Sequence, residues 1–201
     1  MLSDIKLSPV ESRVLGVLVE LSLHLPATTP VAVADLLAAC NTGSAPPLDA
    51  AAVGRALRRL ERLQLAEPAG GTAAGPPPGY RPRLAQRLQL NAAQTVVLAL
   101  LLRHGPLTAE ELSERANALF PFAGAEQVAG VLDSLQHHHN GSWLQQLPAR
   151  DDRPPRYLHG FHAPQEQPPR PAGGQDALLQ RVDELRSLLD RLLPDDDPSG
   201  T

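Results

Sequence analysis

This chain has a single cysteine and no long apolar run, and each of these absences excludes a class of protein. Cys40 is the only cysteine, so neither an internal disulfide nor a cysteine-based zinc cluster can form. Glu20 and His24 interrupt the most apolar stretch, so no run approaches the roughly 20 residues that cross a bilayer. Nothing resembles a secretory signal peptide. We therefore expect a soluble, cytoplasmic protein that does not enter a membrane.

Motifs for catalysis and metal binding are also missing. The sequence has no glycine-rich phosphate loop, no nucleophile motif and no paired-carboxylate motif. Three consecutive histidines (137–139), with His159 and His162, are the one suggestion of a metal site. Consecutive side chains at a helix end cannot all face one ion, so we expect a solvated helix C-terminus there. Cys40 is expected to be a core residue, and the chain is predicted to be non-enzymatic, with no metal and no cofactor.

Acidic charge is concentrated at one end of the chain, although the net charge is only −4. Residues 1–84 carry eight basic and seven acidic side chains, and residues 85–162 carry six and seven. Residues 163–201 carry four basic and eight acidic side chains, so the whole deficit lies there. A strongly basic nucleic-acid-binding protein has a different balance, so any affinity for DNA must come from a local patch.

A helix predicted after the N-cap Asp49, and ending near Ala66, carries such a patch. At 100° per residue its apolar face contains Val53, Leu57 and Leu60. The opposite face contains four arginines: Arg55, Arg58, Arg59 and Arg62. A glycine- and proline-rich loop (70–79) follows, and residues 80–84 return as a basic strand with Arg81 and Arg83. This order is typical of a recognition helix followed by a wing.

The same pattern occurs a second time. Residues 90–98 repeat residues 7–15, and residues 106–112 repeat residues 30–36, where a second short helix is predicted over residues 31–40. Capping boxes begin a helix in both copies, at Ser8–Glu11 and at Thr108–Glu111. Val128 and Leu132 match Val53 and Leu57, and a second ribbon is expected from strands at 143–147 and 156–161. We therefore predict a mainly α-helical α+β fold with small β-ribbons, made of two tandem winged-helix domains (1–84 and 85–162).

The end of the chain is predicted to have three parts. Residues 163–175 are predicted to be a linker, residues 176–193 a coiled-coil-like helix, and residues 194–201 a disordered acidic tail. The helix has an apolar seam with alternating spacings of four and three: Leu178, Val182, Leu185, Leu189 and Leu192. The seam predicts a homodimer, but a helix this short could equally pack on its own chain.

Several of these segments together resemble the YceH-like family of bacterial proteins of unknown function. The segments are residues 7–16, 39–41, 101–103 and 156–159, with Thr108 and Glu111-Leu112, and the C-terminal helix also matches. The resemblance implies a tandem winged-helix protein and supplies no catalytic or ligand-binding residue. Residues 42–47 depart from the family, whose members tend to have a longer polar segment there.

Two functional hypotheses follow from the arginine-bearing face. The second copy has Gly130, Asp133, Ser134 and His137 at the positions of the four arginines, and solubility alone does not explain this asymmetry. The first hypothesis is a DNA-associated transcriptional regulator or chromosome-associated protein, in which the four helix arginines contact phosphates with the wing arginines Arg81 and Arg83 beside them. The contact is expected mainly to the duplex backbone, because residues 50–52 and Gly54 have no side-chain donors or acceptors. The alternative is a non-enzymatic adaptor that binds a protein partner, similar in plan to chromosome-condensation accessory proteins. Only the first hypothesis requires the arginines to be exposed.

Overall fold

The computed structural model describes residues 5–43, 45–70, 79–147 and 154–161. These residues form helices and small antiparallel sheets, which confirms the predicted α+β class with mainly helical content. The predicted linker (163–175), coiled-coil-like helix (176–193) and acidic tail (194–201) lie outside the described residues. The homodimer seam lies there too, so it stays a prediction. Within the described residues, no helix is long and apolar enough to cross a membrane.

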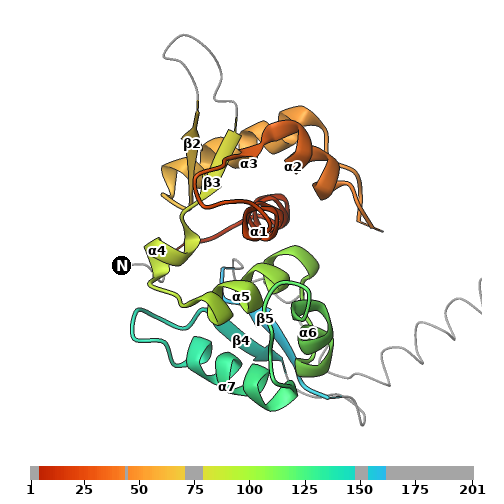
Figure 1. The fold of residues 1–201 in the computed structure, drawn as a ribbon, viewed down its shortest axis with the longest axis vertical. Helices are drawn as coiled ribbons and strands as arrows, with labels where there is room; N and C mark the ends of the chain where they lie inside the picture. Colours follow the sequence, from red (N-terminus) through yellow and green to blue (C-terminus); the bar gives the residue numbers. More distant parts are fainter. Residues whose placement is uncertain (1–4, 44, 71–78, 148–153, 162–201) are drawn as a thin grey trace, which may run out of the picture. The chain divides into compact units, whose positions relative to one another are not determined.

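The described residues contain one order of elements twice (Figure 1). The first half contains α1 (Pro9–Leu23), β1 (Val31–Ala32), α2 (Val33–Cys40), α3 (Ala50–Arg62), β2 (Ala66–Ala69) and β3 (Gly79–Pro82). After α4 (Leu84–Leu88), the second half contains α5 (Ala92–His104), α6 (Ala109–Ala116), α7 (Ala125–Gln136), β4 (Leu144–Leu147) and β5 (Arg156–His159). The first sheet has the order β1-β3-β2, and β4 pairs with β5. An isolated bridge between Leu107 and Tyr157 stands where the first half has β1.

Matching positions in the two halves are buried to the same extent. Val53 and Val128 are both 0% exposed, and Leu57 and Leu132 are both 1% exposed. The caps also agree with the sequence, because Ser8 and Thr108 each form a complete capping box and Asp49 accepts a hydrogen bond from Ala52 N–H. The internal repeat seen in the sequence is therefore a repeat of structure.

Two local predictions need correction, and one helix was not predicted. Val31 and Ala32 form a strand rather than the start of a helix, because they pair with Tyr80 and Gly79 far along the chain. The helix predicted to end near Ala66 ends at Arg62, since Gln64 takes a left-handed conformation (φ 59°). Helix α4 was not predicted, although its two end leucines are spaced four apart and are both fully buried.

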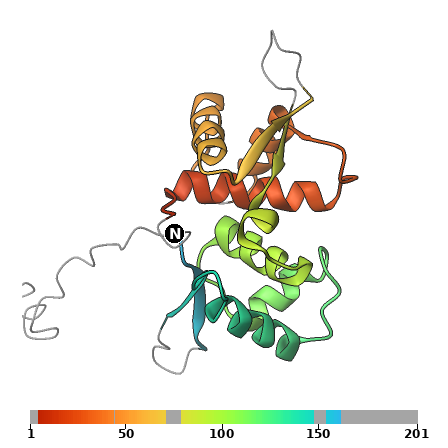
Figure 2. The same ribbon diagram turned by 90° about the vertical axis from the view of Figure 1, so that its left-hand side faces the viewer.

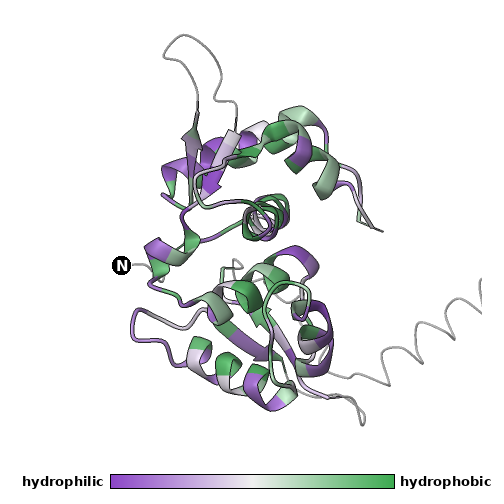
Figure 3. Cartoon of the chain, in the orientation of Figure 1, coloured by the Kyte–Doolittle hydropathy of each residue, from purple (hydrophilic) through white to green (hydrophobic). Residues whose placement is uncertain are grey.

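Helices α1 and α5 lie against each other between the two halves (Figure 2). Most of their residues are apolar (green in Figure 3), and both helices are buried along most of their length. Gly16 permits the close approach, because a Cβ there would lie 2.7 Å from the Ala99 carbonyl oxygen and 2.7 Å from the Arg103 nitrogen. Gly16 and Ala99 hold equivalent positions in the two copies, so the repeated segments meet at matching residues.

A partly buried ion pair between Arg103 and Glu20 lies at the edge of this contact. The guanidinium of Arg103 donates to the Glu20 carboxylate and to Thr42 Oγ1, which lies 2.9 Å away in the turn after α2. Burial raises the pKa of Glu20, and the Arg103 hydrogen bond opposes that rise. Burial, and then the nearby Arg115 and Arg103, lower the pKa of His104 to about 4. His104 is therefore neutral at physiological pH, and its 4.0 Å approach to Glu20 is not an ion pair.

Candidate nucleic-acid interface

The position of α3 is fixed by the turn that precedes it. Asn41 makes two hydrogen bonds with the backbone of Leu48, accepting from its N–H at 2.7 Å and donating to its carbonyl oxygen at 2.9 Å. Arg13 of α1 donates to the Pro46 carbonyl oxygen at 2.9 Å. Asp49 then caps the helix. The turn ties α3 to both α1 and α2, so its outer face has a defined orientation.

The four predicted arginines of α3 are exposed along this outer face. Within the described residues, none of the four makes a hydrogen bond or an ion pair. They line a groove of about 420 Å³ between α3 and the start of α1, together with Ser8, Val10, Glu11, Ala52 and Ala56. We call this surface the arginine groove. The Glu11 carboxylate accepts from Ser8 N–H at 2.9 Å, so it is engaged in the cap of α1.

The two predicted wing arginines lie apart from this groove and have partners within the chain. Arg81 is only partly exposed and donates to the Thr28 carbonyl oxygen. Arg83 forms an ion pair with Glu67 on β2, with 3.1 Å between Nε and Oε2. Both guanidiniums therefore have partners within the first half, and the charge of Arg83 is compensated by Glu67. The sequence could not show this, because each partner is distant or lies on the opposite strand.

The matching face of the second half has a different chemistry. Asp133 Oδ1 of α7 lies 3.1 Å from Nδ1 of His137, which caps the end of that helix, and Ser134 Oγ accepts a hydrogen bond from Gln94 of α5 at 3.1 Å. Gly130 is exposed, and a Cβ added there would meet nothing within 4 Å. No arginine lies on α7. The basic face is therefore a property of the first half.

The other chemically notable residues have structural surroundings. His137 contacts Asp133, His138 Nδ1 accepts from Trp143 Nε1–H at 3.2 Å, and His139 lies 3.0 Å from the Gln89 side-chain oxygen. The three histidines thus point to separate partners, and no group of three potential metal ligands occurs among the described residues. Cys40 is 2% exposed in the core, and burial raises the pKa of its thiol.

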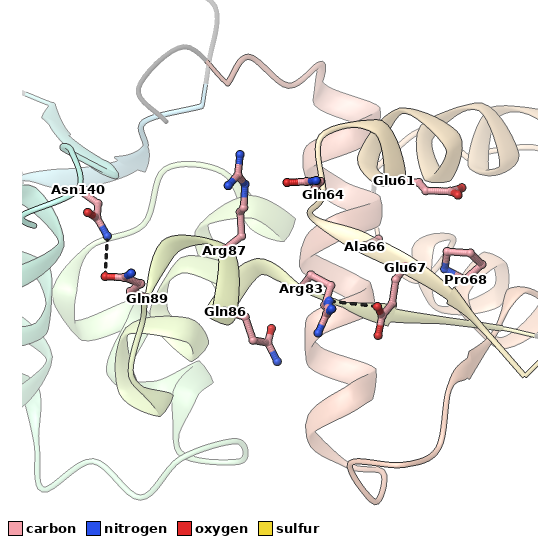
Figure 4. A pocket seen from close by; sticks show the side chains of 10 residues that line it. All are labelled: Glu61, Gln64, Ala66, Glu67, Pro68, Arg83, Gln86, Arg87, Gln89 and Asn140. Atoms are coloured by element: carbon pink, nitrogen blue, oxygen red, sulfur yellow. Dashed lines mark hydrogen bonds and ion pairs between the residues drawn. The ribbon is translucent and has the colours of Figure 1, made fainter. Parts of the chain in front are cut away.

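A second cleft, of about 730 Å³, lies beside β2 and α4 and was not anticipated from the sequence (Figure 4). Figure 4 shows the Arg83–Glu67 ion pair among the lining side chains and, at another side, the hydrogen bond that Asn140 donates to Gln89. Its lining residues include two arginines and two glutamates, so the cleft has no excess of positive charge: Glu61, Gln64, Ala66, Glu67, Pro68, Arg83, Gln86, Arg87, Gln89 and Asn140. This balance makes it a poorer phosphate site than the arginine groove.

The described residues thus form a duplicated α+β fold in which helix α3 carries four exposed arginines on its outer face. Residues 7–153 match a family model described as "Protein of unknown function, DUF480". The chain is 32% identical to a UPF0502 protein of Mesorhizobium japonicum, covering 92% of this chain and 96% of that one. It is 37% identical to one of Stenotrophomonas maltophilia (76% and 70% covered) and 38% identical to one of Geobacter sulfurreducens (66% and 61% covered).

The chain belongs to this DUF480 (UPF0502) family. The predicted resemblance to a bacterial family of unknown function is thereby confirmed. The matched segment, residues 7–153, contains both the arginine groove and the α1–α5 contact. The family description gives no activity.

Proposed function

We propose that this chain is a non-enzymatic, DNA-associated protein that contacts the phosphates of duplex DNA through the arginine groove. The observation that carries the proposal is the set of four exposed guanidiniums on α3, with no partner among the described residues. Guanidiniums bind phosphate oxygens bidentately, and each neutralised phosphate releases counterions. A regulator or a chromosome-associated protein of the cytoplasm would use such a surface.

The kind of DNA contact follows from what lies at each end of α3. The first turn has only alanines at positions 50–52, and Gly54 follows, so it offers no side-chain donor or acceptor to base edges. The arginines begin at Arg55 and continue to the last turn. Backbone contact with weak sequence preference is therefore the expected mode.

We interpret each half as a winged helix, with α3 and the β2–β3 ribbon in the places of recognition helix and wing. In that arrangement the third helix lies along the DNA and the ribbon flanks it. The second half, which lacks arginines on α7, then has another task. Pairing with a second copy or binding a protein partner would fit it, as would a scaffold role through the α1–α5 contact.

The proposal is tested by comparing two variants with the same loss of charge. Arg58→Ala with Arg62→Ala removes two groove arginines, and both side chains are exposed, so the fold should change by less than about 0.5 kcal/mol per site. Arg115→Ala with Arg156→Ala removes two arginines from the second half. Fluorescence anisotropy with labelled random duplex should show affinity at least about tenfold lower for the groove variant only. Equal affinity of the two variants would contradict the proposal.

Absence of any binding would favour the adaptor. If the wild-type protein at micromolar concentration does not bind duplex near about 50 mM salt, phosphate contact is not its function. The same exposed arginines would then be a docking face for an acidic protein surface.

A further inference from the structure

We propose that the second cleft, beside β2 and α4, binds an unpaired DNA base while the flanking phosphates lie in the arginine groove. The inference rests on the proposed function and deepens it, because it names the form of DNA that the surface takes: a duplex with unpaired nucleotides beside it. Four carboxamide side chains line this cleft, and we call it the carboxamide cleft: Gln64, Gln86, Gln89 and Asn140.

The arginine groove and the carboxamide cleft follow one another along α3. A third hollow, of about 500 Å³, is lined by Arg58, Glu61 and Arg62. It is continuous with both, because it shares Arg58 and Arg62 with the groove and Glu61 with the cleft. From Arg55 to Glu61 the helix rises about 9 Å, which is about three phosphate spacings of one DNA strand. One strand can therefore pass from the groove to the cleft.

The two ends of this surface offer different chemistry. The groove presents four guanidiniums, which suit phosphates, but the first turn of α3 offers nothing that reads a base. In the cleft, Arg83 is paired with Glu67, and Arg87 and Glu61 carry opposite charges, so the lining has no net charge. A neutral ring with hydrogen-bonding edges suits such a site better than a phosphate does.

The carboxamides of the cleft have unused hydrogen-bonding capacity. Within the part of the chain that the structure describes, the side chains of Gln64 and Gln86 are exposed and have no hydrogen-bond partner. The Gln89 oxygen accepts from Asn140 Nδ2–H at 3.1 Å, which leaves the Gln89 amino group and the Asn140 oxygen open to a ligand. Because a carboxamide presents a donor beside an acceptor, it pairs bidentately with the edge of a base, adenine above all.

Backbone strain occurs at the same cleft. Among the described residues, the two non-glycine residues with positive φ are Gln64 (φ 59°) and Gln89 (φ 58°), and both line the cleft. A glycine would hold this left-handed conformation at lower cost, but it has no side chain. The strained backbone at both positions therefore carries a carboxamide that the cleft would otherwise lack.

The hollow form of the site favours an unpaired base. A base stacked in a duplex shows only its edge in a groove, which a side chain has to enter. The carboxamides instead line a cleft of about 730 Å³, and in Figure 4 Gln64 lies toward α3 while Gln89 and Asn140 lie toward the second half. This volume is usual for ligand sites, which span about 300–1,000 Å³. An unpaired nucleotide can place its base in such a cleft, as an extruded base enters a pocket.

The test separates the base from its phosphates by using three labelled DNA probes. The first is a blunt duplex, and the second adds a short overhang of adenines. The third adds an equally long overhang of abasic nucleotides, which has the same phosphates and no bases. In anisotropy titrations, the wild-type protein should bind the adenine overhang at least about fivefold more tightly than the abasic overhang. Equal affinity for the two overhangs would overturn the inference.

Two matched variants locate the preference. Gln64→Ala with Gln86→Ala removes two exposed cleft carboxamides that have no partner among the described residues, so the fold should be unchanged. Gln145→Ala with Gln146→Ala removes two exposed carboxamides from β4 as the control. The cleft variant should bind the two overhangs within about twofold of each other, whereas the control should keep the wild-type preference. A preference that the cleft variant retains, or that both variants lose equally, would contradict base binding in the cleft.

An uncharged probe distinguishes this inference from the proposed function. Deoxyadenosine has a base but no phosphate, so the groove arginines do not attract it. In NMR titrations with deoxyadenosine at millimolar concentration, the side-chain amide signals of Gln64 and Gln86 should shift, while those of Gln145 and Gln146 should not. Unshifted cleft signals would overturn the inference. Shifted cleft signals in a protein that does not bind the blunt duplex would support base binding in the cleft and refute only the proposed function.

Discussion

Replacing Gly16 by alanine should destabilise the protein at the contact between α1 and α5. The new Cβ would lie 2.7 Å from the Ala99 carbonyl oxygen and 2.7 Å from the Arg103 backbone nitrogen. Both atoms belong to the backbone of a buried helix, so neither can turn aside as a flexible side chain would. Since ordinary contacts lie near 3.5 Å, the two helices would have to separate by roughly 0.5–1 Å.

The magnitude follows from two opposing effects. Overpacking of a tight interior typically destabilises by about 1–3 kcal/mol, and a gap of this size removes a quarter to a half of the dispersion energy of each flanking contact. The better helix propensity of alanine offsets about 1 kcal/mol. We expect a net loss of up to about 2 kcal/mol, because alanine propensity offsets only part of the overpacking cost along the α1–α5 contact.

Urea denaturation followed by circular dichroism measures the effect, and Gly130 offers a matched control. Gly130 also lies within a helix, but a Cβ there would meet nothing within 4 Å. Gly130→Ala should therefore stabilise the protein by about 0.5–1 kcal/mol through propensity alone. If Gly16→Ala were as stable as Gly130→Ala, the close approach of α1 and α5 would be refuted.

Three further predictions concern the supports of the fold. Gln64→Gly should raise the free energy of unfolding by about 1 kcal/mol in urea denaturation, because Gln64 has φ 59°; a loss would contradict this. Asn41→Ala should lower it by about 1–2 kcal/mol, since two hydrogen bonds to Leu48 disappear; an unchanged midpoint would argue against them. The pKa of His104 is about 4 in the fold against 6.5 ordinarily, so stability should fall as the pH drops from 6.5 towards 4. Between pH 7 and pH 5, the His104→Asn variant should lose about 1 kcal/mol less unfolding free energy than the wild type, allowing for the 31% exposure of the side chain. An identical loss in both proteins would show that burial does not lower the pKa of His104.

The sequence predicted most helices and ribbons because their determinants are local. Ser8, Asp49 and Thr108 cap the helices that they were expected to cap, and the apolar spacing of Val53 and Leu57 places both in the core. The prediction that a helix begins at Val31 was wrong, because the apolar pattern continues through residue 31 without a break. Only pairing with β3, which follows much later in the chain, makes it a strand.

The contact between the halves was missed, although the sequence contains a hint of it. Gly16 and Ala99, and likewise Glu20 and Arg103, are separated by the same 83 positions that relate the first helices of the two copies. A small residue at matching positions lets the two helices approach closely, and opposite charges at matching positions can form an ion pair between them. Periodicity alone describes each helix and cannot show which helices meet.

The arginine-bearing face of α3 could be predicted because it depends only on helix geometry. The exposed positions of Arg55, Arg58, Arg59 and Arg62 follow from their angles relative to the apolar face. The surroundings could not be predicted in the same way. The ion pair between Arg83 and Glu67 and the backbone hydrogen bond from Leu7 N–H to the Phe161 carbonyl oxygen join residues that only the fold brings together.

The salt dependence of duplex binding tests the central claim most directly. Each phosphate that an arginine neutralises contributes about one unit to the slope of log K against log salt concentration. Titrations of the wild-type protein, and of the variant Arg58→Ala with Arg62→Ala, should show slopes that differ by about two, with the affinity for different duplex sequences reduced alike. Equal slopes for the two proteins would contradict the account, because the groove arginines would then make no phosphate contact.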